Sequence, residues 1–283
     1  GAMHGILYTD KEGQAVSPLY TWQDQRGDQI NPESGKSYAK ELSEITGYAM
    51  ATGFGLTTHY YNTKHHLIPK EAVSFCTIPD YVAFSIAQEK EPLLHQSMAA
   101  SLGIYDIQKG CFDTEAVERA GMDIEMLPRV TKENALCGKT KEGVPVAVSL
   151  GDNQASFLGS VNEECKVLLN VGTGAQLSAY SEKIAEGENL ECRPYVGDSW
   201  LLAGSALCGG YAYSLMKRFF EETLELAETE AKRPTYEILN QAAGAAYEEE
   251  KQLTVDTRFN GTRQNPSITG SVIGITVDNF RPG

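Results

Sequence analysis

The segment Val148–Ser160, VSLGDNQASFLGS, most constrains the fold of this chain. An apolar run over 144–150, rich in β-branched residues, predicts a strand that stops at Gly151 and Asp152, and a helix follows near Gln154. In open α/β sheets, ligands bind beyond the carboxyl ends of strands, so Asp152 is a candidate catalytic residue. The alternative is that Asp152 only caps the following helix, a position that aspartate favours. This segment alone leaves both interpretations open.

Strand and helix patterns are mixed along the whole chain. The predicted strands are 6–8, 15–16, 144–150, 166–170 and 200–203, and the predicted helices are 37–45, 79–87, 211–230 and 235–250. In the helix 211–230, the residues expected to face inward are Leu215, Met216, Phe219 and Phe220. This mixture indicates an α/β protein, and 283 residues suffice for two domains. The predicted internal boundary lies near 160–164.

The composition excludes several classes of function. The net charge of −14 argues against binding to nucleic acid or to an anionic membrane surface, both of which require Lys and Arg. The six cysteines form no Cys-x-x-Cys pair and no cluster with zinc spacing. We therefore expect no protein-bound metal site, six reduced thiols and a cytoplasmic location.

Two further segments combine polar groups suited to small ligands. Asn170–Gly174 places Gly-Thr-Gly at a strand end, where N–H groups and a hydroxyl can bind phosphate oxygens, although a simple β-turn explains the same residues. Thr21–Gly27, TWQDQRG, offers an aromatic face, a carboxylate and a guanidinium, which suits a sugar. A helix start with an exposed Asp24–Arg26 pair is its alternative. Met3–Gly5 adds an imidazole, which in isolation is more typical of a structural histidine.

Taken in order, these segments resemble the FGGY carbohydrate kinases, and within them the sedoheptulokinase subgroup, with xylulokinases next. The segments that carry the resemblance are Met3–Gly5, Val16–Gly27, Ala51–Gly55, Ile78–Ile86, Ala99–Asp106, Ser149–Ser156, Leu169–Leu177, Gly204–Glu221 and Gly270–Gly283. Two positions depart from the family. Ala2 stands where Gln is usual, and His95–Gln96 stand where related kinases often carry Asp, which bears on the identity of the sugar.

The resemblance implies an actin-like, ribonuclease H-like pair of α/β domains. A sugar-binding N-terminal domain would cover 1–158, and a nucleotide-binding C-terminal domain would cover 159–283. The family begins with a phosphate-binding hairpin ahead of its Met-His-Gly segment and ends with an adenosine-binding segment beyond its C-terminal signature. We therefore expect the fold to be truncated at both ends in this chain. Unpaired sheet edges would follow, so self-association as a homodimer is an expected outcome.

The reaction implied by the resemblance is transfer of the γ-phosphoryl group of ATP, with Mg²⁺ on its phosphates, to a primary hydroxyl of a ketose, with sedoheptulose favoured. Asp152 would act as the general base. The residues implied to bind the sugar are Met3, His4, Trp22, Asp24, Arg26 and Asn153, and those implied to bind the nucleotide or its phosphates are Gly172, Thr173, Gly174, Gly209 and Gly210.

Two hypotheses from different classes remain. The first is an ATP-dependent ketose kinase, with a xylulokinase or another FGGY kinase as its closest alternative. The second is a sugar-binding fragment without catalysis. Asp152–Asn153 and Gly172–Gly174 favour the first hypothesis for the protein from which this chain derives. The expected loss of both ends favours the second for the isolated chain, for which we expect no turnover.

Overall fold

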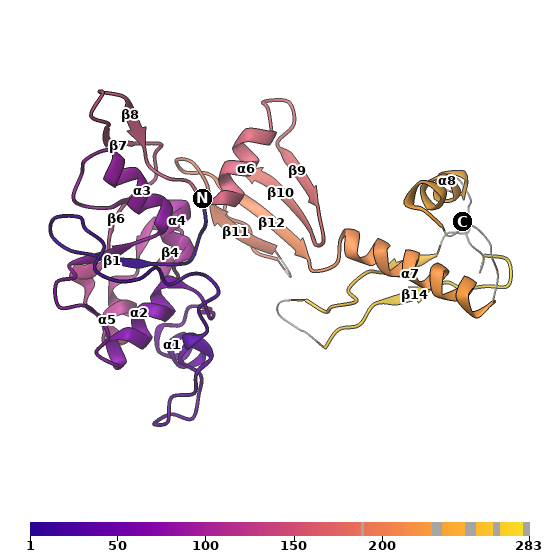
Figure 1. Ribbon diagram of the computed structural model, residues 1–283, viewed down its shortest axis with the longest axis horizontal. Coiled ribbons are helices and arrows are strands. Elements are labelled where there is room, and N and C mark those ends of the chain that lie inside the picture. The colour runs from indigo at the N-terminus through magenta and orange to yellow at the C-terminus, as the bar shows by residue number, and fades with distance from the viewer. Residues whose placement is uncertain (188–189, 228–233, 247–252, 263–266, 280–283) are drawn as a thin grey trace. The chain divides into compact units, whose positions relative to one another are not determined.

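A computed structural model of the chain describes residues 1–187, 190–227, 234–246, 253–262 and 267–279 (Figure 1). Its contacts divide the chain into two compact units, which we treat separately. The first unit comprises Gly1–Lys166, Tyr180–Glu186 and Cys192–Leu202, and the second comprises Val167–Ala179, Gly187–Glu191 and Ala203–Gly283. Within the described ranges, no helix combines the length and the apolar character needed to span a bilayer. All six cysteines are free thiols.

The first unit is built from short strand pairs and helices (Figure 1). The pairs are β1 (Leu7–Thr9) with β2 (Ser74–Cys76), β3 (Leu93–His95) with β6 (Arg129–Thr131), β4 (Tyr105–Asp106) with β5 (Cys111–Phe112), and β7 (Leu136–Lys139) with β8 (Pro145–Ala147); only β3 and β6 are parallel. The helices are α1 (Tyr38–Thr46), α2 (Gly55–Lys64), α3 (Ile78–Ile86), α4 (Gln96–Ser101), α5 (Thr114–Arg119) and α6 (Asp152–Ser160). Single 3₁₀ turns lie at Arg26–Asp28 and Ile124–Met126.

Helix α1 shows how local sequence sets these elements. Ser37 is its N-cap, and the Ser37 side chain accepts a hydrogen bond from the N–H of Lys40 at 3.3 Å. Gly47 ends the helix in the left-handed conformation, with φ 81°, which glycine adopts without steric cost. The predicted helix over 37–45 is therefore confirmed, with each end displaced by one residue.

The core of the first unit forms around β1, β2 and α2. The side chains of Ile6, Tyr8, Leu56, Tyr60 and Phe75 are completely buried. Burial of one such side chain contributes about 1.5–3 kcal/mol, so this cluster fixes the position of β1. Five of the six predicted sugar-binding residues lie shortly before or after β1 in the sequence; the sixth, Asn153, lies on α6.

Strands β9 (Val167–Val171), β10 (Ala175–Ser181), β11 (Leu190–Pro194) and β12 (Trp200–Ala206) form a four-stranded sheet in the order β11-β12-β10-β9. β9 and β10 are antiparallel, with Val171 opposite Ala175, so residues 172–174 form the turn between them. Helices α7 (Gly210–Leu226) and α8 (Tyr236–Ala246) and the antiparallel pair β13 (Thr254–Asp256) and β14 (Ser271–Ile273) belong to the second unit.

Two sequence predictions about these elements are wrong in part. The strand expected over 144–150 is limited to Pro145–Ala147. The face of α7 expected to point inward includes Met216 and Phe219, whose side chains are 43% and 61% exposed. Helical periodicity predicts an apolar face, but it does not specify what covers that face.

Of the two C-terminal helices, only α7 has its end within the described residues. Helix α7 ends at Leu226, before the expected end at 230, and residues 228–233 lie outside the described residues. Helix α8 is described to Ala246, and the remainder of the predicted 235–250 helix also lies outside the described residues. The predicted strands at 166–170 and 200–203 correspond to β9 and β12.

Candidate active site

Asp152 is the first residue of α6, with Gly151 as the N-cap. Its side chain is exposed, and Oδ1 accepts the N–H of Asn153 at 2.7 Å. The expectation that Asp152 caps a helix beginning near Gln154 is wrong, because the helix begins two residues earlier and has no side-chain cap. A carboxylate in the first helical turn interacts favourably with the positive end of the helix dipole. Asp152 therefore presents a carboxylate oxygen at the surface of the first unit.

The absence of a side chain at Gly151 leaves space for the side chains of Gln154 and Met3. The φ of this glycine, −54°, is accessible to any residue, so the backbone conformation does not require glycine here. A Cβ placed there would lie 2.5 Å from Oε1 of Gln154 and 2.8 Å from the sulfur of Met3. The close approach of Met3 brings the first segment of the chain against the turn that carries Asp152. The N–H of Asp152 also donates to the carbonyl of Gly1 at 3.0 Å.

His4 is held in a fixed orientation by its own neighbours. Its backbone has a φ of 73°, in the left-handed region, and its N–H donates to the hydroxyl of Ser101 at 3.1 Å. The ring nitrogen Nδ1 donates to the carbonyl of Ser101 at 2.6 Å, and the ring stacks on Phe54 with centroids 4.9 Å apart. Because a carbonyl only accepts, the proton of the neutral ring lies on Nδ1.

Asn153 is tied to a later strand. Its Oδ1 accepts a hydrogen bond from Nη1 of Arg193 at 3.0 Å. The next residue, Gln154, is buried and donates from Nε2 to the carbonyl of Pro194 at 3.1 Å. These bonds attach the first turn of α6 to β11 residues that belong to the same unit.

Asp24 and Arg26 form a mostly buried pair rather than the exposed pair that was the alternative from sequence. The Nε–Oδ1 distance is 2.7 Å, and the two side chains are 18% and 19% exposed, respectively. Arg26 also donates from Nη1 to Oδ1 of Asn62. The Nδ2 of Asn62 donates to the hydroxyl of Tyr8 at 3.1 Å, and that hydroxyl contacts Nδ1 of His59 at 2.9 Å. A polar chain therefore runs from Arg26 into the core.

Sequence reasoning missed the inner members of this chain. His59 and Asn62 lie three residues apart on α2, on one face of the helix, and this spacing is the signal that could have identified them. Burial lowers the pKa of His59 to about 4, so the ring is neutral at physiological pH. Burial also raises the pKa of the Tyr8 hydroxyl.

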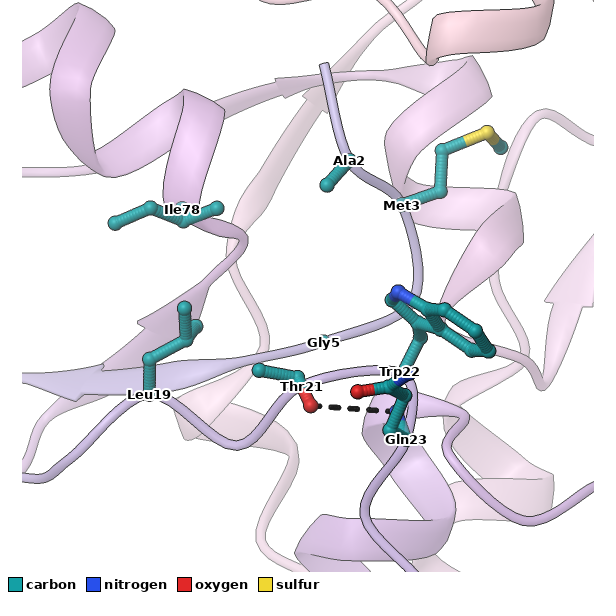
Figure 2. Close-up of a pocket in the computed structure, with 8 residues that line it drawn as sticks. All are labelled: Ala2, Met3, Gly5, Leu19, Thr21, Trp22, Gln23 and Ile78. Atoms are coloured by element: carbon teal, nitrogen blue, oxygen red, sulfur yellow. Dashed lines mark hydrogen bonds between the residues drawn. The ribbon is translucent and has the colours of Figure 1, made fainter.

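A pocket of about 170 Å³ lies beside the Ala2–Gly5 segment (Figure 2). Its lining residues are Ala2, Met3, Gly5, Leu19, Thr21, Trp22, Gln23 and Ile78. Figure 2 shows the side chains of Met3 and Trp22 extending to one side of this segment, away from Leu19 and Ile78. The pocket thus brings together two of the predicted sugar-binding residues, and the indole of Trp22 is 58% exposed there.

In the second unit, the turn between β9 and β10 is joined to the start of α7. The N–H of Gly209 donates to the carbonyl of Thr173 at 2.8 Å, and that of Gly210 donates to the carbonyl of Gly172 at 2.7 Å. A Cβ on Gly209 would overlap the carbonyl oxygen of Gly174. The five residues predicted to bind nucleotide or phosphate therefore form one backbone cluster.

The described part of the chain contains no group of three or more His, Cys, Asp or Glu side chains that could hold a metal ion. The turn 172–174 offers an anion main-chain N–H groups and the hydroxyl of Thr173. Within the described ranges, the N–H groups of Thr173 and Gly174 have no acceptor, and Thr173 is exposed.

A model of the N-terminal domain of the FGGY family of carbohydrate kinases matches residues 1–159. The chain belongs to this family. It is 28% identical to sedoheptulokinase of Mus musculus and 26% identical to sedoheptulokinase of Homo sapiens, and each alignment covers all of this chain. The chain spans 64% of the length of these two relatives.

Solved structures of sugar kinases share the fold. The xylulose kinase of Rhodospirillum rubrum gives a TM-score of 0.75 at 16% identity over 98% of this chain and 58% of that one. The glycerol kinase of Plasmodium falciparum with ADP gives a TM-score of 0.67 at 17% identity over 98% of this chain and 57% of that one. The fold of this FGGY chain is therefore the actin-like α/β fold implied by the sequence.

His95 and Gln96, which depart from the family pattern as Ala2 does, are 0% and 4% exposed. Nε2 of Gln96 donates to the carbonyls of Tyr195 and Gly197, both at 2.7 Å. Neither residue lines the pocket beside Trp22. These two residues could affect the sugar preference only by changing the positions of the residues that they contact.

Proposed function

We propose that the enzyme containing this sequence transfers the γ-phosphoryl group of ATP to a primary hydroxyl of a ketose, with sedoheptulose preferred and its 7-phosphate as the product. The observation that carries the proposal is the exposed carboxylate of Asp152 at the first position of α6, against the Met3 segment. Its Oδ1 is oriented by the N–H of Asn153, and Oδ2 has no partner among the described residues. This oxygen is free to accept a proton.

In this proposal, Asp152 takes the proton of the attacking hydroxyl as the new O–P bond forms. The indole of Trp22 offers its face to the C–H groups of the sugar, and Met3 completes the apolar side. His4, Asp24, Arg26 and Asn153 supply the polar contacts. Because four of these groups are already hydrogen-bonded to other parts of the first unit, the site is largely preformed and loses little conformational entropy on binding.

The phosphate side of the proposal rests on the turn 172–174 and the start of α7. The N–H groups of Thr173 and Gly174 and the Thr173 hydroxyl would donate to phosphate oxygens, while Gly209 and Gly210 allow the close backbone approach. Magnesium bound to the ATP phosphates would neutralise charge in the transition state. No protein ligand for the ion is assigned.

The preference for sedoheptulose is supported by the two relatives named above. A second candidate is xylulose, because xylulose kinase of Streptomyces coelicolor is 26% identical over 65% of this chain. A third is glycerol, because glycerol kinase of Mycoplasma genitalium is 24% identical over 98% of this chain.

A substrate panel tests the proposal. The enzyme is supplied with ATP, Mg²⁺ and sedoheptulose, xylulose, ribulose or glycerol, ADP release is followed, and phosphorus NMR locates the phosphorylated carbon. We expect the highest kcat/KM with sedoheptulose and turnover in the usual kinase range of about 1–100 s⁻¹. A higher value with xylulose would favour the second candidate. A preference for glycerol, or sugar binding by calorimetry without any ADP release, would overturn the proposal.

A further inference from the structure

The turn that carries Asp152 is held by side chains from two other helices. The hydroxyl of Ser149 donates to Oδ1 of Asp80, which lies on α3. The N–H of Gly151 donates to the hydroxyl of Ser97, on α4, at 3.1 Å. These contacts occur three residues and one residue before Asp152, so they fix the direction in which the chain enters α6.

Asp80 makes a contact that is not needed to form helix α3. Thr77 caps this helix, and its hydroxyl donates to Oδ2 of Asp80 at 2.6 Å. The N-cap hydrogen bond of Thr77 does not require a carboxylate at position 80. Asp80 is only 2% exposed, and a buried ionised carboxylate is costly unless each of its oxygens has a hydrogen-bond partner. The second oxygen obtains its partner from Ser149. The buried carboxylate therefore links the start of α3 to the Asp152 turn.

Ser97 is equally constrained on α4. It is 1% exposed, and its N–H donates to Nδ1 of His95 at 3.2 Å. Since Nδ1 accepts there, the Ser97 hydroxyl 2.8 Å away donates to the same nitrogen and keeps its lone pairs for the N–H of Gly151. Burial lowers the pKa of His95 to about 4, so the ring stays a neutral acceptor at physiological pH.

We propose that Asp80 and Ser97 are positioning residues that act through Ser149 and Gly151 to aim the carboxylate of Asp152 at its substrate hydroxyl. The proposal rests on the role of Asp152 in the proposed function. Neither residue lines the pocket beside Trp22, so neither is expected to contact the sugar. A misplacement of about 1 Å at the reacting group can cost on the order of 10²-fold in rate, which is the size of effect this turn can control.

The test compares Asp80→Asn, Ser149→Ala and Ser97→Ala in the enzyme that contains this sequence. An asparagine has one acceptor oxygen in place of two, and either alanine removes its hydroxyl contact. We expect each variant to lower kcat by about 10–100-fold while the Kd for the sugar, measured by calorimetry, stays within about twofold. Because Asp80 and Ser149 share one hydrogen bond, the double variant should be no slower than the slower single variant.

Asp113→Asn is the matched control. Asp113 caps α5, with one oxygen accepting the N–H of Ala116 and the other accepting the hydroxyl of Tyr48 at 3.1 Å. Its loss should lower the midpoint of thermal unfolding and leave kcat within about twofold. Full activity of folded Asp80→Asn or Ser97→Ala would overturn the proposal, and so would a rate loss in proportion to lost stability in all variants. If Asp80→Asn does not fold, Ser149→Ala decides, since it leaves the carboxylate in place.

These results separate the two proposals. Wild-type enzyme that phosphorylates a ketose, together with variants of equal kcat, would contradict only the positioning role. Wild-type enzyme that binds a sugar and releases no ADP would contradict the proposed function itself.

Discussion

The guanidinium carbon of Arg26 lies 4.3 Å from the centre of the Tyr20 ring. The same guanidinium donates from Nε to Asp24 and from Nη1 to Asn62, so its planar face and part of its edge are occupied. A lysine can supply the charge but neither the flat stacking surface nor the fork of donors. The conformation of the segment Thr21–Gly27 therefore depends on arginine at position 26.

Arg26→Lys should lower the free energy of unfolding by about 1–3 kcal/mol and weaken sugar binding. Urea unfolding of this chain and calorimetry with sedoheptulose measure the two effects. Arg258→Lys is a matched control, because Arg258 follows Asp256 with the same spacing and bonds to it at 2.6 Å but is 45% exposed. An exposed pair contributes at most about 1 kcal/mol, so equal losses in both variants would contradict the special role of Arg26.

Asp152→Asn should lower kcat by about 10²–10⁴-fold, because the amide keeps the shape of the side chain but cannot accept the proton. Binding of sedoheptulose should remain within about threefold, since Asn153 and its bond to Arg193 are unchanged. Steady-state kinetics and calorimetry give the two values. A variant that keeps more than about a tenth of the wild-type turnover would rule out Asp152 as the general base.

Gly209→Ala should separate the 172–174 turn from α7 and weaken nucleotide binding, because the added Cβ would overlap the Gly174 carbonyl. Backbone atoms cannot move aside as a flexible side chain can. Gly244→Ala in α8 is the control, since its Cβ would meet nothing within 4 Å, and it should stabilise the helix by about 0.5–1 kcal/mol. Fluorescence titration with a labelled ATP analogue and thermal unfolding check both expectations. Unchanged nucleotide affinity in Gly209→Ala would count against the phosphate-binding role of this cluster.

The free energy of unfolding of the chain should change between pH 4 and 7 because Asp80 titrates in this range. Burial raises the pKa of this carboxyl to about 6, above its unfolded value of 3.8. The folded chain therefore holds the proton more tightly, and the associated stability is complete below pH 4 and is lost as the pH rises through 6. The ionisable groups that face Asp80 are the amino group of Gly1 and the thiols of Cys76 and Cys137.

Urea unfolding of wild type and Asp80→Asn at several pH values isolates this contribution. The wild type should lose on the order of 2–3 kcal/mol relative to the variant as the pH rises from 4 to 7. His59 and His95, whose lowered pKa values of about 4 act in the opposite direction, are present in both proteins and cancel in the difference. Parallel stability curves would show that Asp80 titrates as an exposed aspartate does.

Local features of the sequence predicted much of the fold. Helix α1 and strands β9 and β12 depend on neighbouring residues, and the start of each was predicted within a residue or two. A helix after the 144–150 segment was predicted for the same reason, although it begins at Asp152 rather than near Gln154.

The partners of the site residues could not be predicted in this way. Ser149 and Asp80 are 69 residues apart, Gly151 and Ser97 are 54 apart, and Arg26 and Asn62 are 36 apart. Such pairs form only when the core brings separate segments together, and no local pattern in one sequence encodes them. The lining of the pocket by Leu19 and Ile78 was missed for the same reason.

Three amide groups at the start of α7 join this helix to the turn 172–174. The N–H groups of Gly209 and Tyr211 both donate to the carbonyl of Thr173, and that of Gly210 donates to the carbonyl of Gly172. Their hydrogens can exchange with deuterium only when the hairpin turn and the helix come apart. The exchange rates of these three amides therefore measure one shared opening event, and a molecule bound at the turn would slow all three together.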